Sequence, residues 1–188
     1  MARAKGSILI HFRDFVRTYH GESTLESCLK KLNPEDRAVL EGLVIHSGWY
    51  PVGVWNRALG IFLKDNYPDP DAGMRKLSQY IANEDLNSVY KMILRLGSAE
   101  FLLKRTTSLW NRYFEKGSFH AEEVEPHRWR LLLSAPKGED AAPDYFTCGP
   151  GVCAWLVHGL ALTGVTATVE HVKCRLSAGP HCEYSARW

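Results

Sequence analysis

Cysteines are unevenly distributed along this chain, and their placement constrains its fold more than any other feature. Four of the five lie between Cys148 and Trp188, and only Cys28 precedes them. Thiols gathered in this way bind a metal, form disulfides, or fill a core as small apolar side chains. Cys28 lies among leucines at helical spacing, which favours core filling. The other four require a more specific explanation.

The spacing within the last cysteines favours metal binding. His171 and Cys174 are three residues apart, and Cys182 follows after seven residues that include the turn formers Gly179 and Pro180. If the two flanking segments form a hairpin, Cys174 and Cys182 lie on neighbouring strands near its turn. We therefore expect these three side chains to be ligands.

A closed structural zinc site needs a fourth ligand. Cys153 is our first choice and Cys148 is the alternative, and either would complete a tetrahedral Cys3His set. The spacing is not that of a standard zinc finger. Free buried or redox-active thiols and native disulfides therefore remain alternatives.

Length and composition indicate an ordinary globular protein. A chain of 188 residues is long enough for one well-buried core, so we expect a single domain, 1–188. The formal net charge is only +2, which gives no electrostatic footprint for nucleic acid. No apolar run approaches the roughly 18 residues of a membrane span, and no secretory segment is recognisable. A cytoplasmic location follows as the default, and persistent disulfides are uncommon there.

Residues 1–117 show helical periodicity. Apolar residues from Ile8 to Tyr19 recur at steps of three and four, Ser23-x-x-Glu26 resembles a capping box, and Asn33 precedes a proline. Similar patterns follow after Pro51, before and beyond Asn83 as far as Leu94, and from Phe101 to Phe114. This part is expected to be a helical subdomain.

The pattern changes after Gly117. Residues 119–124 and 129–133 alternate between apolar and polar, Gly151–Leu162 is an apolar helix, and two further strands follow at 166–172 and 182–187. The expected fold class is α+β, with an N-terminal helical subdomain, 1–117, and a ββαββ antiparallel-sheet subdomain, 118–188, that carries the cysteine cluster.

This order of elements, with Gly6 at the start of the first helix and Gly21-Glu22 at its end, resembles the heme nitric oxide/oxygen binding (H-NOX) domain. The vinyl-reductase-type domains, TRAPP-type folds and a myxobacterial paralogue family of unknown function are similar in part. The resemblance covers essentially the whole chain. It implies a sensor domain, and in H-NOX proteins a heme.

The residues that hold heme in the family are not matched. The family's Leu-His pair corresponds to Leu109-Trp110, and an indole offers iron no lone pair. Its Tyr-x-Ser-x-Arg signature corresponds to Leu132–Pro136, in which only Ser134 is retained. We therefore expect a heme-free domain. His120 is the best remaining ligand candidate for the alternative, a heme-based gas sensor with a non-standard ligand.

The cysteine region agrees better with the family. A subset of H-NOX proteins is similar in having a zinc site with His-x-x-Cys, a second cysteine after seven residues and a further cysteine earlier in the chain. The resemblance thus implies zinc bound by Cys153, His171, Cys174 and Cys182. It leaves Cys148 open as the replacement for Cys153.

No catalytic motif is recognisable, so the expected function is that of a non-enzymatic sensor or signalling adaptor with a structural or redox-responsive zinc site. A small apolar ligand held between the two subdomains, near Trp49, Tyr50, Trp55 and Trp110, is the other alternative. Possible partners are a second copy, as a homodimer, or a signalling protein. No nucleic acid and no membrane span are expected.

Overall fold

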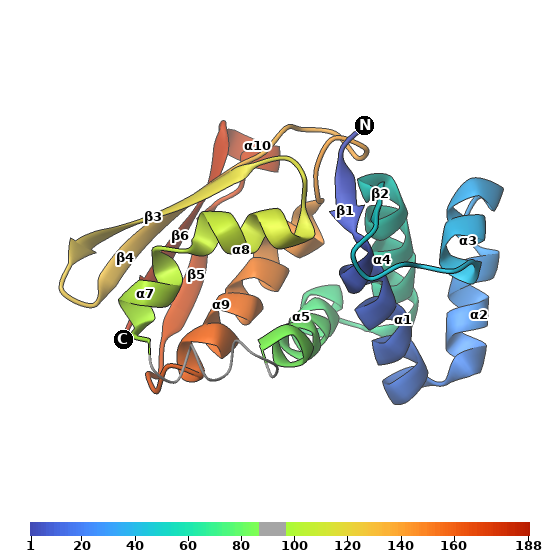
Figure 1. Cartoon of the computed structure of the whole chain (residues 1–188), viewed down its shortest axis with the longest axis horizontal. Helices are drawn as coiled ribbons and strands as arrows, with labels where there is room; N and C mark the ends of the chain where they lie inside the picture. Colours follow the sequence, from blue (N-terminus) through green and yellow to red (C-terminus); the bar gives the residue numbers. More distant parts are fainter. Residues whose placement is uncertain (87–96) are drawn as a thin grey trace.

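The computed structural model describes residues 1–86 and 97–188. The two halves of the chain lie side by side (Figure 1), and the apolar pattern predicted from Val89 to Leu94 falls outside the described residues. The first half contains β1 (Arg3–Lys5), α1 (Gly6–His20), α2 (Glu22–Lys30), α3 (Pro34–Glu41), β2 (Trp49–Pro51), α4 (Val52–Asn66) and α5 (Pro70–Leu86). The helical subdomain predicted from periodicity is present.

The second half is built on a sheet. After α7 (Ala99–Leu103) and α8 (Thr106–Tyr113) come β3 (Ser118–Glu125), β4 (Arg128–Ser134), the π-helical turn η1 (Thr147–Gly151), α9 (Val152–Ala161), β5 (Thr168–Lys173), α10 (Arg175–Ala178) and β6 (His181–Arg187). The four long strands form one antiparallel sheet in the order β3-β4-β6-β5. The α+β class and the ββαββ order are therefore confirmed.

Helix α1 shows why the periodicity was informative. Ile8, Phe12, Phe15 and Val16 are all buried, and they lie on one face because successive turns return after 3.6 residues. The Asn33 side chain accepts a hydrogen bond from the backbone N–H of Asp36, the third residue of α3, as expected of an N-cap.

The predicted capping box at Ser23 is wrong in detail. Helix α2 begins at Glu22, one residue earlier, and its N-cap is Gly21. Gly21 has a φ of 87°, which most residues avoid, so the tight link between α1 and α2 replaces a side-chain cap.

The sheet buries one face only. Along β6, Cys182, Tyr184 and Ala186 are fully buried, while the residues between them are partly exposed. Helices α8 and α9 cover this face (Figure 1). Since successive side chains in a strand point to opposite faces, Cys182 is directed into the core.

A short ribbon fixes the N-terminus across the junction of the two halves. Strand β1 pairs with β2, and Ala4 also bridges to Phe114 after α8. Three-residue strands carry no readable alternation, so the sequence did not predict them. The buried apolar side chains of both halves form one continuous cluster. Within the described residues, no helix is long and apolar enough to cross a membrane.

Candidate metal centre

Three cysteines converge where the last hairpin meets η1. Cys174 follows β5 directly, Cys182 is the second residue of β6, and the short helix α10 lies between them. Cys148 comes from η1, and its carbonyl accepts a hydrogen bond from the Tyr184 hydroxyl on β6. The predicted hairpin arrangement of Cys174 and Cys182 is present.

The three sulfur atoms lie within 4.8 Å of one another. Thiolates on one zinc ion would be about 3.7 Å apart, as follows from Zn–S bonds near 2.3 Å in a tetrahedron. Cys148 and Cys182 are fully buried, and Cys174 is half-buried. Small side-chain rotations would therefore bring these sulfurs to the spacing of a metal site.

Cys148, the alternative fourth ligand, is part of this group, and Cys153 is not. The two thiols are five residues apart along the η1–α9 segment, and of the two only Cys148 lies within 4.8 Å of the sulfurs of Cys174 and Cys182. Burial raises the pKa of Cys153 to about 12, as expected for a thiol without a stabilising partner.

His171 lies beside the thiols but not within 4.8 Å of all three sulfurs. Its ring stacks on Tyr184 with the centroids 4.8 Å apart, on the covered face of the sheet. Its Nε2 is buried and has no hydrogen-bond partner. A buried imidazole nitrogen without a partner is costly, and a bound metal would satisfy it. His171 thus remains the best fourth ligand.

The Cys148 and Cys182 thiols differ in acidity. A hydrogen bond from the Cys148 thiol lowers the pKa of Cys182 well below its ordinary value, and His171 and the backbone N–H of Arg175 act in the same direction against burial. The same hydrogen bond, together with burial, raises the pKa of Cys148. The group therefore favours one thiolate at neutral pH, and a thiolate is the form that binds metals.

Arg175 supplies the opposite charge. It is only 1% exposed, and its guanidinium donates to the carbonyl oxygens of Pro136, at 2.6 Å, and Pro143. Its backbone N–H lies 3.3 Å from Cys182 Sγ, and its charge offsets a small part of the rise in the pKa of Cys148. Among the described residues it makes no ion pair with a carboxylate.

A charge this deeply buried needs a compensating anion. Zinc with three thiolates and one imidazole carries a net charge of −1, which Arg175 would neutralise. The donor types, the unpartnered His171 nitrogen and the charge of Arg175 therefore fit zinc. Nothing in the sequence around Arg175 distinguished it from a surface arginine, because its burial depends on the fold.

A separate cavity lies between the two halves, in the region where the resemblance implied heme. It has a volume of about 80 Å³ and an almost entirely apolar lining. Of the aromatic residues proposed from sequence, Trp55 and Trp110 line it, while Trp49 and Tyr50 do not. Trp49 lies under the Lys5 ammonium, and the Tyr50 hydroxyl accepts from the Ile45 amide.

Among the described residues that line this cavity there is no histidine. Pockets for ligands of drug size or larger start near 300 Å³. Trp110, which the resemblance matched to the heme histidine, lines the cavity, and its indole N–H donates to the Lys116 carbonyl at 2.9 Å. His120 is exposed on β3, and Ser134 is exposed at the end of β4, so neither lines the cavity.

Similarity to known proteins is found in the fold and not in the sequence. No family model and no curated protein matches the sequence. The H-NOX protein of S. oneidensis in its Fe(II)NO ligation state is similar over 97% of this chain and 98% of its own, with a TM-score of 0.75 and 14% identity. The unliganded Fe(II) H-NOX protein of K. algicida is similar over 97% and 95%, with a TM-score of 0.72 and 13% identity. At these identities the likeness concerns the fold, and the chain is a distant example of the H-NOX fold.

Proposed function

We propose that this protein is a heme-free sensor or signalling adaptor domain whose zinc ion is held by Cys148, Cys174, Cys182 and His171. The convergence of three thiol sulfurs within 4.8 Å, at a buried hairpin, carries the proposal. The buried guanidinium of Arg175 is compatible with it, because a zinc site of three thiolates and one imidazole carries the single negative charge that would compensate this cation.

The position of Cys148 suggests how such a site would report a signal. Two side chains of the helical half bond to η1: Trp55 donates to the Thr147 hydroxyl at 2.8 Å, and Ser78 donates to the Gly151 carbonyl at 2.6 Å. Zinc would therefore connect the β5–β6 hairpin to a turn that is already fixed to α4 and α5. Oxidation of a ligand thiolate releases zinc and would loosen that connection.

The cavity between the two halves supports a heme-free domain. Trp110, which the resemblance sets at the position of the heme histidine, lines it, and its volume of about 80 Å³ is small beside the roughly 300 Å³ of ordinary ligand pockets. The domain would therefore act through its thiols and through a partner. A second copy of the chain or a signalling protein is proposed as that partner, and the cytoplasm as its location.

Two measurements on the same preparation test the proposal. The absorbance spectrum after incubation with hemin should show no Soret band from bound heme. Hydrogen peroxide should release one zinc per chain to a chromophoric chelator, at the rate at which ligand thiols are oxidised. A stable Soret band, or zinc that stays bound after Cys174 and Cys182 are oxidised, would sink the proposal.

The cavity supports a second candidate, the binding of a very small apolar ligand. An engineered apolar cavity of about 150 Å³ binds benzene or xenon, so a cavity about half that size would admit xenon-sized molecules. Xenon should shift the indole N–H resonances of Trp110 and Trp155, which line the cavity, and leave that of Trp49 unchanged. Equal shifts at all three would exclude a specific site.

A further inference from the structure

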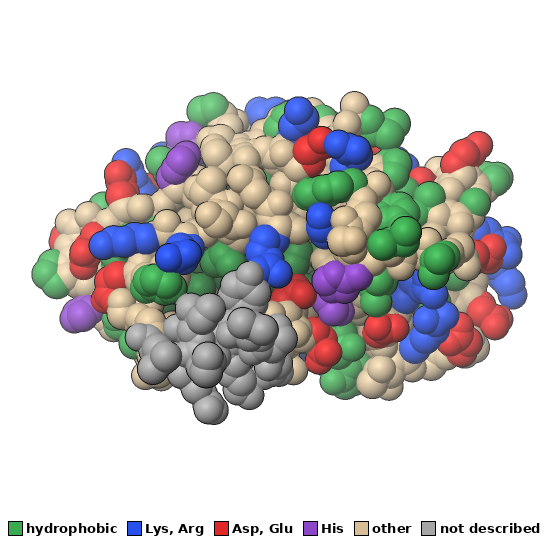
Figure 2. Space-filling model, in the orientation of Figure 1, with side chains coloured by type: hydrophobic (Ala, Val, Ile, Leu, Met, Phe, Trp, Pro, Cys, Tyr) green, Lys and Arg blue, Asp and Glu red, His purple; other side chains and the backbone are tan. Residues whose placement is uncertain are grey.

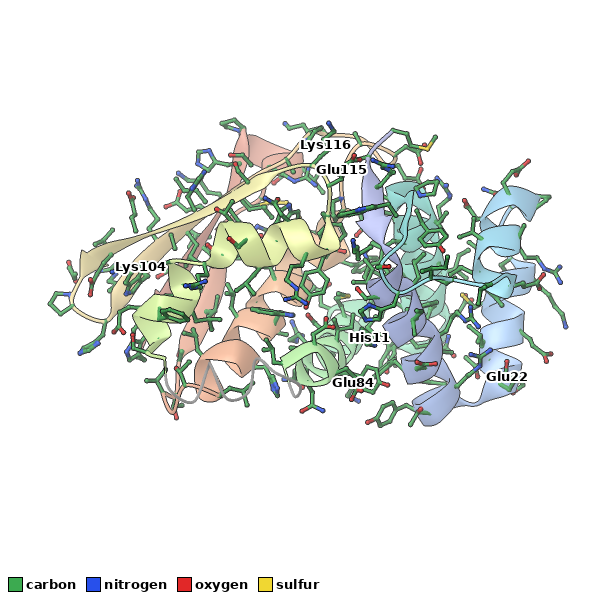
Figure 3. The ribbon with its side chains drawn as sticks, viewed as in Figure 1. His11, Glu22, Glu84, Lys104, Glu115 and Lys116 are labelled. Atoms are coloured by element: carbon green, nitrogen blue, oxygen red, sulfur yellow. The ribbon has the colours of Figure 1, made fainter. Side chains whose placement is uncertain are left out.

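A second group of metal-ligand side chains lies outside the thiol site, and histidine and acidic side chains do lie next to one another near the middle of the face shown in Figure 2. His11, His46 and Asp85 each place one possible ligand atom within 4.8 Å of the other two. His11 is on α1, near the contact with α5 (Figure 3), His46 precedes β2, and Asp85 is near the end of α5. Neither the fold comparison nor the zinc proposal uses these residues.

We propose that His11, His46 and Asp85 bind one divalent transition-metal ion. Two imidazoles and one carboxylate are a common ligand set for zinc, iron, cobalt or nickel, and they leave at least one coordination position open. His11 Nε2 already lies 3.1 Å from Asp85 Oδ1, close to the roughly 3.3 Å expected for two ligands of one tetrahedral zinc. Only His46 has to approach.

The carboxylate is held in place from behind. Asp85 Oδ2 accepts a hydrogen bond from the Tyr113 hydroxyl at 2.6 Å, and the Trp155 indole donates to that hydroxyl at 3.3 Å. Bonds of this kind orient metal ligands in known sites, and losing them weakens metal binding about 10- to 100-fold. Oδ1 is thereby directed to the histidine side.

The His46 backbone is also fixed. Its carbonyl accepts from the Ser7 amide at 3.1 Å, and Ser7 lies one helical turn before His11 on the same face of α1. The loop approaches α1 closely because Gly6 has no Cβ; one there would lie 2.1 Å from the Ile45 carbonyl oxygen. Both histidines are therefore carried by backbone segments that contact each other directly.

Solvent reaches the site from one side. The side chains of His11 and Asp85 are 13% and 14% exposed, while His46 is exposed. A buried carboxylate with an exposed histidine allows a hydrated metal ion to enter without opening the core. The open coordination position would face the same side, where water or a small anion could bind.

The test is a cobalt titration of the whole chain. One equivalent of zinc is added first to satisfy the thiols, because cobalt does not displace zinc from a thiolate site of higher affinity. Cobalt is then added, and bound metal is counted after equilibrium dialysis. We expect one cobalt per chain, with at least tenfold weaker binding in His46→Ala and in His11→Ala. Tyr113→Phe should weaken binding about 10- to 100-fold.

His120→Ala is the matched control, since His120 is an exposed histidine on the sheet. Its affinity for cobalt should equal that of the unmodified chain. Cys148→Ser should weaken the binding of the first equivalent of zinc and leave cobalt binding unaltered. Failure of the thiol site can therefore be distinguished from failure of the second site. Cobalt binding that is absent, or that His46→Ala leaves unchanged, would overturn the inference.

Discussion

Replacing Arg175 with methionine tests the electrostatic account of the thiol site. The guanidinium is 1% exposed and donates to two carbonyl oxygens, Pro136 and Pro143. Methionine fills much of the same volume but leaves both carbonyls unsatisfied, at about 1 to 3 kcal/mol each. It also leaves a thiolate without its counter-charge. We expect Arg175→Met to lower the free energy of unfolding by about 3 to 5 kcal/mol.

Urea unfolding followed by circular dichroism measures the loss in free energy of unfolding directly. Thermal unfolding gives a second readout. For a domain of this size, each kcal/mol shifts the melting temperature by about 2 to 4 °C, so Tm should fall by about 6 to 20 °C. Arg175→Lys keeps the charge but has a single ammonium in place of the guanidinium with its two donor nitrogens. Its free energy of unfolding should lie between those of the unmodified protein and Arg175→Met.

Arg130→Met is the matched control. Arg130 pairs with Glu122 at 2.5 Å, but the two side chains are 48% and 55% exposed. Such surface pairs contribute less than about 1 kcal/mol. If Arg175→Met also unfolds within about 1 kcal/mol of the unmodified protein, the buried charge is not what the site depends on.

Three further predictions concern other parts of the chain. Burial raises the pKa of Asp144 to about 6, so the folded state holds more protons than the unfolded state between about pH 4 and 6. Stability should therefore fall by up to about 3 kcal/mol as pH rises through this window, and Asp144→Asn should remove most of that fall in urea unfolding series. Gly6→Ala should destabilise the fold by about 1 to 3 kcal/mol, because the added Cβ would meet the Ile45 carbonyl oxygen. Gly60→Ala should stabilise α4 by about 1 kcal/mol, because nothing lies within 4 Å of the added Cβ. Equal melting temperatures of the two variants would contradict this. Cys28 is 2% exposed and burial raises its pKa to about 11, so mass spectrometry should find it unlabelled by a thiol reagent until the protein is unfolded.

The features that sequence predicted well are those set by local periodicity. The buried stripe of α1 and the alternation along β4 and β6 are visible in the residues themselves, because burial of one face imposes a period. The pairing of the two segments that carry Cys174 and Cys182 was predictable from their alternation and from the turn formers between them, whereas helix α10 in that link was not predicted.

The features that sequence missed depend on where distant segments meet. The sequence favoured Cys153 over Cys148 as the fourth ligand, whereas the π-helical turn places the Cys148 thiol at the hairpin. Arg175 looks like a surface residue until its burial is known. The group at His11 brings together residues far apart in sequence, and no spacing rule could have linked them.

The zinc content of purified protein, compared among three variants, tests the central claim most directly. The account predicts that, after dialysis has removed metal from the weaker site at His11, His46 and Asp85, the unmodified protein and Cys153→Ser each keep one zinc per chain, and that Cys148→Ser and Cys174→Ser lose it. Metal analysis by mass spectrometry measures this on protein that circular dichroism shows to be folded. Equal zinc in Cys148→Ser and the unmodified protein, or loss of zinc in Cys153→Ser alone, would contradict the account.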